Sequence, residues 1–153
     1  MMSIPIKENL LKACENFLEA RVKTLTKAIA DSRQSSWEDT KSSAGDKYET
    51  SREMIQGEIS QNSRQLEEAQ KLYSVLELMR NTDPSTGTVV VGSLVKTNLG
   101  NFYIGIPVGM IETEGLKYAL ISSSSPIGGF LLGKRKGEKF NFHNQSYILN
   151  SVE

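Results

Sequence analysis

Two apolar stripes with helical spacing constrain this chain more than any other feature of its sequence. Within each stripe, residues that can be buried recur at intervals of three and four, which is typical of a helix with one buried face. The first stripe consists of Leu11, Cys14, Leu18, Val22, Leu25 and Ile29, and the second of Ile55, Ile59, Asn62, Leu66, Ala69, Tyr73 and Leu76. Because neither stripe is stable in water, we expect each to cover the other in an antiparallel helical hairpin, a coiled coil in which the polar Asn62 sets the register.

The segment between the stripes is strongly polar. From residue 30 onward, Trp37 and Tyr48 are its only large apolar side chains before Met54. It holds no proline and one glycine, Gly45, so both helices can continue through it and reverse close to that glycine. Two arms of about 35 residues would each be about 50 Å long at 1.5 Å per residue. The sequence therefore predicts a hairpin over residues 1–81 with a water-exposed tip near 43–49.

The second half of the chain has a β-strand pattern. A cluster of turn-forming residues at 81–87 separates it from the hairpin. We expect strands at residues 88–95, 102–108, 118–122, 140–142 and 147–152, and a short helix within 125–134 that ends at Gly133. The predicted fold is therefore α+β: the helical hairpin, then a small antiparallel β domain over residues 82–153 with one short helix.

Composition excludes several classes of protein. The 18 basic and 18 acidic side chains cancel, which argues against a non-specific nucleic-acid binder. Cys14 is the single cysteine, so no internal disulfide forms, and its apolar helical neighbours favour a packing role. Charged residues stand close to the N-terminus and no apolar run is long enough to cross a bilayer, so we expect no membrane association and a cytoplasmic location.

Signs of an enzyme are few. His143 is the only histidine, which excludes a multi-histidine metal site, and it lies in a predicted surface turn. The glycine-rich stretch near Gly128 lacks the ending of a phosphate-binding loop. We therefore expect no catalytic activity of the chain by itself, and the roles of His143 and Trp37 stay open.

Two carboxylates at the predicted tip are the candidate site. Asp46 and Glu49 stand three residues apart, on one face at the start of the second helix. Such a pair binds Mg²⁺ weakly and needs further ligands from a substrate or a host protein. Acidic residues in a first helical turn are also favoured by capping and by the helix dipole, and the spacing alone favours that structural interpretation.

Two stretches resemble a known family, the bacterial transcript-cleavage and elongation factors GreA and GreB. The first is Gly45-Asp46-Lys47-Tyr48-Glu49, similar to the Gly-Asp-x-x-Glu motif at the tip of the family's hairpin. The second, similar to the family's C-terminal motif, is Ile121-Ser122, Ser125-Pro126-Ile127-Gly128, Leu131-Leu132-Gly133-Lys134 and Gly137-Glu138. The resemblance covers nearly the whole chain.

The resemblance implies a coiled coil followed by an FKBP-like domain. In the family, the C-terminal domain docks at the rim of the secondary channel of RNA polymerase and the coiled coil enters the channel. The tip acids help to hold the second catalytic Mg²⁺, which stimulates the polymerase to hydrolyse a backtracked RNA transcript. By position, Asp46 and Glu49 would be those acids, sharing the ion only in the complex, and Ser125, Pro126 and Ile127 would lie near the docking surface of a protein that is otherwise a monomer.

Three other interpretations stay open. After Glu49 the chain departs from the family's usual tip sequence, which fits a non-catalytic regulator that occupies the channel and inhibits. An FKBP-like domain could also be a peptide-binding or prolyl-isomerase module. Finally, the two stripes would fit an oligomeric coiled coil with no polymerase partner.

Overall fold

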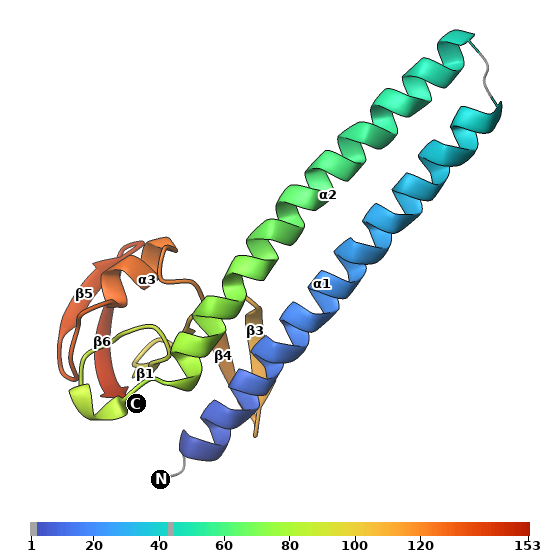
Figure 1. Ribbon diagram of the computed structural model, residues 1–153. Helices are drawn as coiled ribbons and strands as arrows, with labels where there is room; N and C mark the ends of the chain where they lie inside the picture. Colours follow the sequence, from blue (N-terminus) through green and yellow to red (C-terminus); the bar gives the residue numbers. More distant parts are fainter. Residues whose placement is uncertain (1–2, 43–44) are drawn as a thin grey trace. The chain divides into compact units, whose positions relative to one another are not determined.

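The chain folds into two long helices followed by a small sheet, in the computed structural model shown in Figure 1. The structure describes residues 3–42 and 45–153, without the side chains of residues 3–5, 36, 38–42, 45–49 and 84. Helix α1 spans Ser3–Ser42 and helix α2 spans Gly45–Arg80. A single 3-10 turn, η1 (Pro84–Thr86), precedes the sheet. The predicted α+β class and the pairing of the two helices are confirmed.

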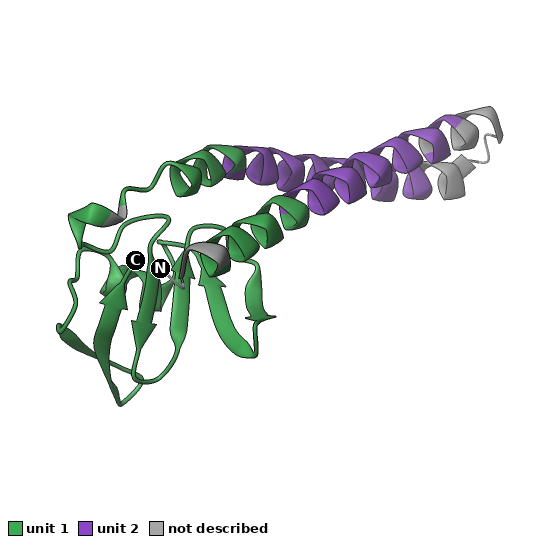
Figure 2. Cartoon of the chain, turned by 90° about the horizontal axis from the view of Figure 1, so that it is seen from below, with its two compact units in different colours: residues 1–17, 73–153 green, residues 18–72 purple. Residues whose placement is uncertain are grey.

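The chain divides into two compact units (Figure 2). Unit 1 contains residues 1–17 and 73–153, and unit 2 contains residues 18–72. The first turns of α1 and the last turns of α2 thus belong with the sheet. The predicted boundary between residues 81 and 82 follows the order of secondary structure along the chain, whereas the two units are defined by packing. The predicted boundary therefore stays a prediction.

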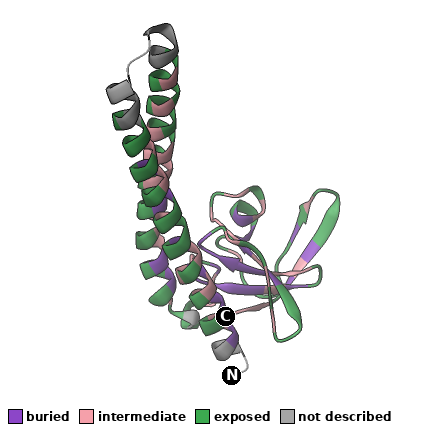
Figure 3. Cartoon of the chain, turned by 90° about the vertical axis from the view of Figure 1, so that its right-hand side faces the viewer, coloured by how far each residue is buried: buried purple, intermediate pink, exposed green. Residues whose placement is uncertain are grey.

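Unit 2 is an antiparallel helix pair with a thin core. Its buried side chains are Leu18, Leu25 and Ile29 on α1 and Ala69 on α2. Farther along the helices, none of the described side chains in residues 30–37 and 50–68 is buried (Figure 3). The apolar stripe of α2 is only half-buried there, at Ile55, Ile59 and Leu66. A polar helix pair of this kind follows directly from the sequence of residues 30–54.

In unit 1 the start of α1 is buried more deeply than the periodicity predicts. Leu10 is completely buried while Leu11, the predicted member of the stripe, is only half-buried. Cys14 is also fully buried. Burial raises the pKa of the Tyr103 phenol, and a charge interaction with nearby Cys14 raises it further. In α2, Leu76 and Met79 are buried while Tyr73 is 37% exposed. The stripe shifts because these turns pack on a sheet as well as on each other.

The sheet has six strands in the order β3-β4-β2-β1-β6-β5. Their bounds are β1 Leu94–Thr97, β2 Asn101–Ile104, β3 Gly109–Thr113, β4 Leu116–Ile121, β5 Lys139–Phe142 and β6 Gln145–Val152. The prediction of a wholly antiparallel sheet is wrong in one place, because β2 and β4 pair in parallel. The reason is β3, a strand that the sequence pattern does not predict. It forms a hairpin with β4, so β4 runs in the same direction as β2.

The first predicted strand is also displaced. Residues 88–93 form only an isolated bridge between Thr88 and Arg135, and β1 begins at Leu94. Positive φ angles at Gly87 and Gly92 interrupt the extended backbone that the β-branched residues favour. The other predicted strands correspond to β2, β4, β5 and β6, and the predicted short helix is α3 (Pro126–Leu131), followed by Gly133 at φ 84°.

Each face of the sheet has its own core. On one face, strand residues such as Val95, Phe102 and Leu149 pack around Leu131 of α3, with Ile127 partly buried against them. On the other face, Met79 of α2 packs against the backbone of Gly105, just after β2. The sheet is therefore covered by α3 on one side and by the sheet-proximal turns of α1 and α2 on the other.

Candidate functional site

The predicted tip acids fall at the start of α2. α1 ends at Ser42 and α2 begins at Gly45, which is where the sequence predicts the reversal. Asp46 and Glu49 lie within the bounds of α2, but their side chains lie outside the described residues, as do those of Glu38 and Asp39. The predicted placement of Asp46 and Glu49 on one face therefore stays a prediction.

Two contacts between the helices of unit 2 define the register of the pair. Arg21 Nη2 donates to Gln65 Oε1 over 3.4 Å, and Ser32 Oγ donates to Glu58 Oε2 over 3.5 Å. In an antiparallel helix pair, the average of the two residue numbers is nearly the same for every pair of residues that face each other. The two contacts have their midpoints at residues 43 and 45. Both agree with a reversal between Ser42 and Gly45, so the register is consistent along unit 2.

The described charged side chains nearest the reversal include one positive and one negative residue. Arg52 and Glu53 on α2 are exposed, and Trp37 on α1 is 57% exposed. Among the side chains that the structure describes, no cluster of three histidine, cysteine, aspartate or glutamate residues is arranged to hold a metal ion. The side chains of Asp46, Glu49, Glu38 and Asp39 lie outside the described residues and so outside that statement.

The second candidate site is the start of α3, where Ser125 caps the helix. The amide of Gly128 donates to Ser125 Oγ over 3.1 Å, and that hydroxyl donates to the carbonyl of Ser122 over 2.7 Å. Pro126 occupies the first turn, where its missing amide hydrogen costs no helical hydrogen bond. The Ser-Pro pair in the sequence thus has a local structural role: it starts a short helix and ties it to the end of β4.

The predicted docking residues differ in exposure. Pro126 is exposed, whereas Ser125 and Ile127 are half-buried, and Ile127 packs against the core of the sheet. Two apolar residues in the same segment are exposed: Phe130 at 46%, and Leu132, which belongs to the C-terminal motif, at 38%. The exposure of Phe130 has no signal in the sequence, because the six residues of α3 are too few to define a buried face.

Cys14 is a packing residue, as predicted. It is fully buried, and burial, with a smaller contribution from Glu15, raises the pKa of its thiol to about 12. The thiol therefore stays protonated near neutral pH, and its burial disfavours the thiolate that nucleophilic chemistry requires.

Comparison with known proteins gives no assignment. No protein-family model matches the chain, and neither the curated proteins nor the solved structures yield a match. Over the described residues, no helix is both long enough and apolar enough to span a bilayer.

Proposed function

We propose that the chain is a Gre-like transcription elongation factor that binds in the secondary channel of RNA polymerase. In this proposal unit 2 enters the channel and the sheet of unit 1 is an FKBP-like domain that docks at the rim. Asp46 and Glu49 then stimulate cleavage of backtracked transcripts. The register of the helix pair is the main support, because it agrees with a reversal at the motif Gly45-Asp46-Lys47-Tyr48-Glu49.

The composition of unit 2 also supports the proposal. A helix pair with few buried side chains and a surface of mixed charge is compatible with solvent over most of its surface. Entry into a water-filled channel requires such a surface. α1 and α2 have 40 and 36 residues, about 60 and 54 Å of helix at 1.5 Å per residue. The pair is long enough to carry a short motif deep into a partner.

The proposed mechanism needs only two carboxylates from this chain. A Mg²⁺ ion shared with the polymerase would supply activation of a water molecule and neutralisation of charge on the phosphate oxygens. Asp46 and Glu49 would supply oxygen ligands or accept hydrogen bonds from that water, since neither the chain nor the polymerase alone completes the ligand set. This dependence on a partner agrees with the expectation that the chain is not an enzyme by itself.

Cleavage of a backtracked transcript tests the proposal. Stalled elongation complexes are mixed with the wild type, with Asp46→Asn plus Glu49→Gln, or with Glu53→Gln as a matched control on the same helix. We expect the wild type to release a 3′ RNA fragment, the double variant to lose at least about a hundredfold in rate, because a positioned catalytic group typically contributes about 10²–10⁴-fold, and the control to keep its rate. Equal release by the wild type and the double variant would exclude the tip acids.

A non-catalytic channel regulator is the second candidate. The segment Thr50-Ser51-Arg52-Glu53 departs from the family's usual sequence after the second tip acid, which favours a chain that occupies the channel without stimulating hydrolysis. The same complexes distinguish the two functions. The regulator would slow RNA synthesis, release no fragment, and compete with an authentic cleavage factor.

A further inference from the structure

β3 is the outermost strand on one side of the sheet, and among the described strands it pairs with β4 alone. The two strands are joined by a two-residue turn at 114–115, where the φ angles are 51° and 80°. A turn of this kind closes with hydrogen bonds between the residues that flank it, Thr113 and Leu116. Hydrogen-bonded pairs alternate along an antiparallel hairpin, so the backbone N–H and C=O groups of Met110 and Glu112 point away from β4. β3 therefore directs hydrogen-bonding groups outward at the edge of the sheet.

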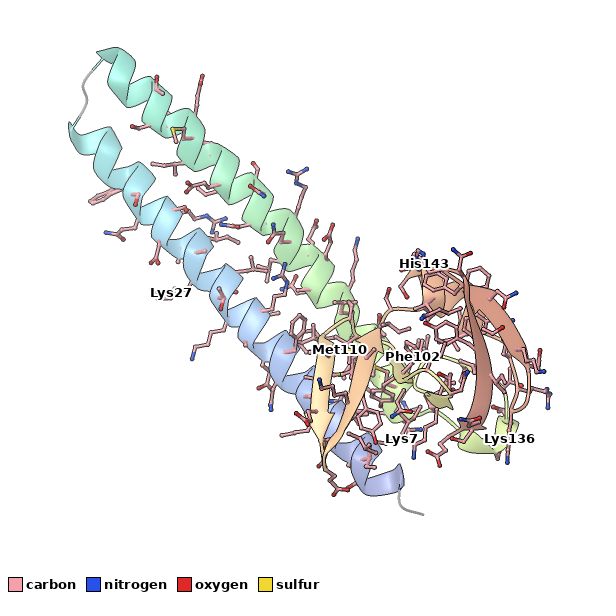
Figure 4. All side chains as sticks on the ribbon, turned by 180° about the vertical axis from the view of Figure 1, so that it is seen from behind. Lys7, Lys27, Phe102, Met110, Lys136 and His143 are labelled. Atoms are coloured by element: carbon pink, nitrogen blue, oxygen red, sulfur yellow. The ribbon has the colours of Figure 1, made fainter. Side chains whose placement is uncertain are left out.

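The side chains at these two positions lie on one face of the sheet. Met110 pairs with Ala119 and Glu112 pairs with Lys117, and Ala119 is partly buried against the core that includes α3. Because side chains alternate along a strand, Met110 and Glu112 both project on the face that carries α3. Met110 is 64% exposed there, and Glu112 is exposed. Figure 4 shows Met110 on β3, at the opposite side of the sheet from His143. An apolar side chain and a carboxylate thus flank the outward backbone groups.

The strand at the other edge, β5, has different residues at the equivalent positions. The β5–β6 hairpin also has a two-residue turn with positive φ angles, at 143–144, so the same alternation directs the backbone of Lys139 and Asn141 outward. A lysine at an edge position is a common protection against pairing with another chain. In β3 the equivalent residues are Met110 and Glu112. The methionine offers an incoming strand an apolar neighbour, and the glutamate favours a basic one.

The charge of the β3–β4 hairpin selects among the possible partners. Residues 109–118 contain two acidic side chains, Glu112 and Glu114, and one basic side chain, Lys117, a net charge of −1. A second copy of β3 would bring the same two glutamates to this edge, so pairing between two copies places like charges close together. A basic residue opposite Glu112 makes a favourable cross-strand pair instead. An apolar residue opposite Met110 removes exposed apolar surface from water.

We infer that β3 binds an extended segment of a partner protein, which adds to the six-stranded sheet as one further antiparallel strand. The segment carries a basic residue opposite Glu112 and, two positions later, an apolar residue opposite Met110. Main-chain hydrogen bonds to β3 supply the affinity, and these two side chains supply the selectivity. The inference does not rest on the proposed function, because β3 contains neither the tip acids nor any residue of the C-terminal motif.

An NMR titration of the isotope-labelled whole chain with a synthetic peptide tests this inference. The peptide is Ser-Thr-Val-Lys-Thr-Leu-Val-Thr-Ser with blocked ends, in which the lysine and the leucine are the residues expected opposite Glu112 and Met110. We expect the changes in amide chemical shift to concentrate in residues 109–113. Hydrogen exchange of the Met110 and Glu112 amides should slow about tenfold at a peptide concentration of about ten times the Kd, because the bound state protects them.

Two N-methylated peptides separate strand addition from other modes of binding. An N-methyl group on the lysine of the peptide removes an amide hydrogen that points toward β3, and we expect the affinity to fall about fivefold or more. The matched control carries the N-methyl group on the threonine between the lysine and the leucine. The amide of that threonine points away from β3, so the control should change the affinity less than about twofold.

Variants of the chain locate the site. Glu112→Lys should weaken binding of the peptide about threefold at low salt, and should strengthen binding of a peptide with glutamate in place of lysine by a similar factor. Met110→Pro removes an outward N–H without breaking a hydrogen bond to β4, and we expect it to weaken binding about fivefold. Asn141→Pro makes the same change at an outward position of β5 and should leave the affinity unchanged. Circular dichroism of each variant verifies that it is folded.

Three results would overturn the inference. One is the absence of chemical-shift changes in residues 109–113 when the peptide is added. Another is equal affinity of the two N-methylated peptides, which would mean that the peptide does not bind as an added strand. The last is protection of the Met110 and Glu112 amides that grows with protein concentration in the absence of peptide, which would mean that a second copy of the chain takes this edge.

Discussion

Gly128 lies so close to Ser122 that a β-carbon at position 128 would come within 2.3 Å of the Ser122 carbonyl oxygen. The same glycine donates its amide hydrogen to Ser125 Oγ. A backbone carbonyl cannot move aside as a flexible side chain can, so glycine is required here by the close approach of two backbones. The tight connection between β4 and α3 therefore depends on one residue of the candidate docking motif.

Gly128→Ala should destabilise unit 1. The added methyl group forces the start of α3 away from the end of β4, and overpacking of this kind typically costs about 1–3 kcal/mol. The measurement is the free energy of unfolding from denaturant titration. Gly129→Ala is the matched control, because the methyl group added there would meet no atom within 4 Å, and it should be neutral or slightly stabilising. Equal stability of the two variants would contradict the close approach.

Ser125→Ala should remove the cap of α3. The substitution leaves the amide of Gly128 without its acceptor and the carbonyl of Ser122 without its donor. Loss of an N-cap typically costs about 1 kcal/mol. Ser124→Ala provides the comparison, since that serine is exposed and its hydroxyl only contacts Ser122 Oγ. A loss of stability in Ser124→Ala as large as that in Ser125→Ala would argue against capping.

The stability of the wild type should fall at alkaline pH because of Cys14. The pKa of its thiol is about 12 in the folded chain against an ordinary value of 9.0, so between these values the unfolded state has released a proton that the folded state retains. The free energy of unfolding is therefore unaffected by this thiol below about pH 8. Above that pH it falls, and at pH 10 the loss is about 1 kcal/mol. Chemical denaturation at pH 7 and pH 10 measures the loss.

Cys14→Ala isolates this effect from that of the tyrosines, which also ionise at high pH. The variant has lower stability at both pH values because it leaves a cavity. The difference in stability between wild type and variant should shrink by about 1 kcal/mol at pH 10. A difference that does not change with pH would mean that the thiol ionises equally in both states.

Asn62→Leu should stabilise the helix pair of unit 2. Asn62 is half-buried within the apolar stripe of α2, where a polar side chain fixes register at a cost in stability. We expect a gain of about 1 kcal/mol, seen as a higher Tm by circular dichroism at 222 nm. Gln61→Leu, at the exposed neighbouring position, should leave the Tm nearly unchanged. A lower Tm for Asn62→Leu would show that the amide is required where it stands.

Much of the helical part can be predicted because its signals are local. Spacings of three and four predict a helix whatever it packs against, and the lack of proline over residues 30–54 lets both helices continue to Ser42 and from Gly45. The short helix is predictable for the same reason, since Ser125, Pro126 and Gly133 mark its start and end within ten residues.

The sequence by itself determined the two long helices, the short helix and strands β2, β4, β5 and β6, because dihedral preferences and apolar spacing act between near neighbours. Only the tertiary structure decided the parallel pairing of β2 with β4, the burial of Leu10 in place of Leu11, and the exposure of Phe130. Each of these depends on residues far apart in the chain that meet on one sheet, and on which apolar surfaces remain uncovered after the others have packed.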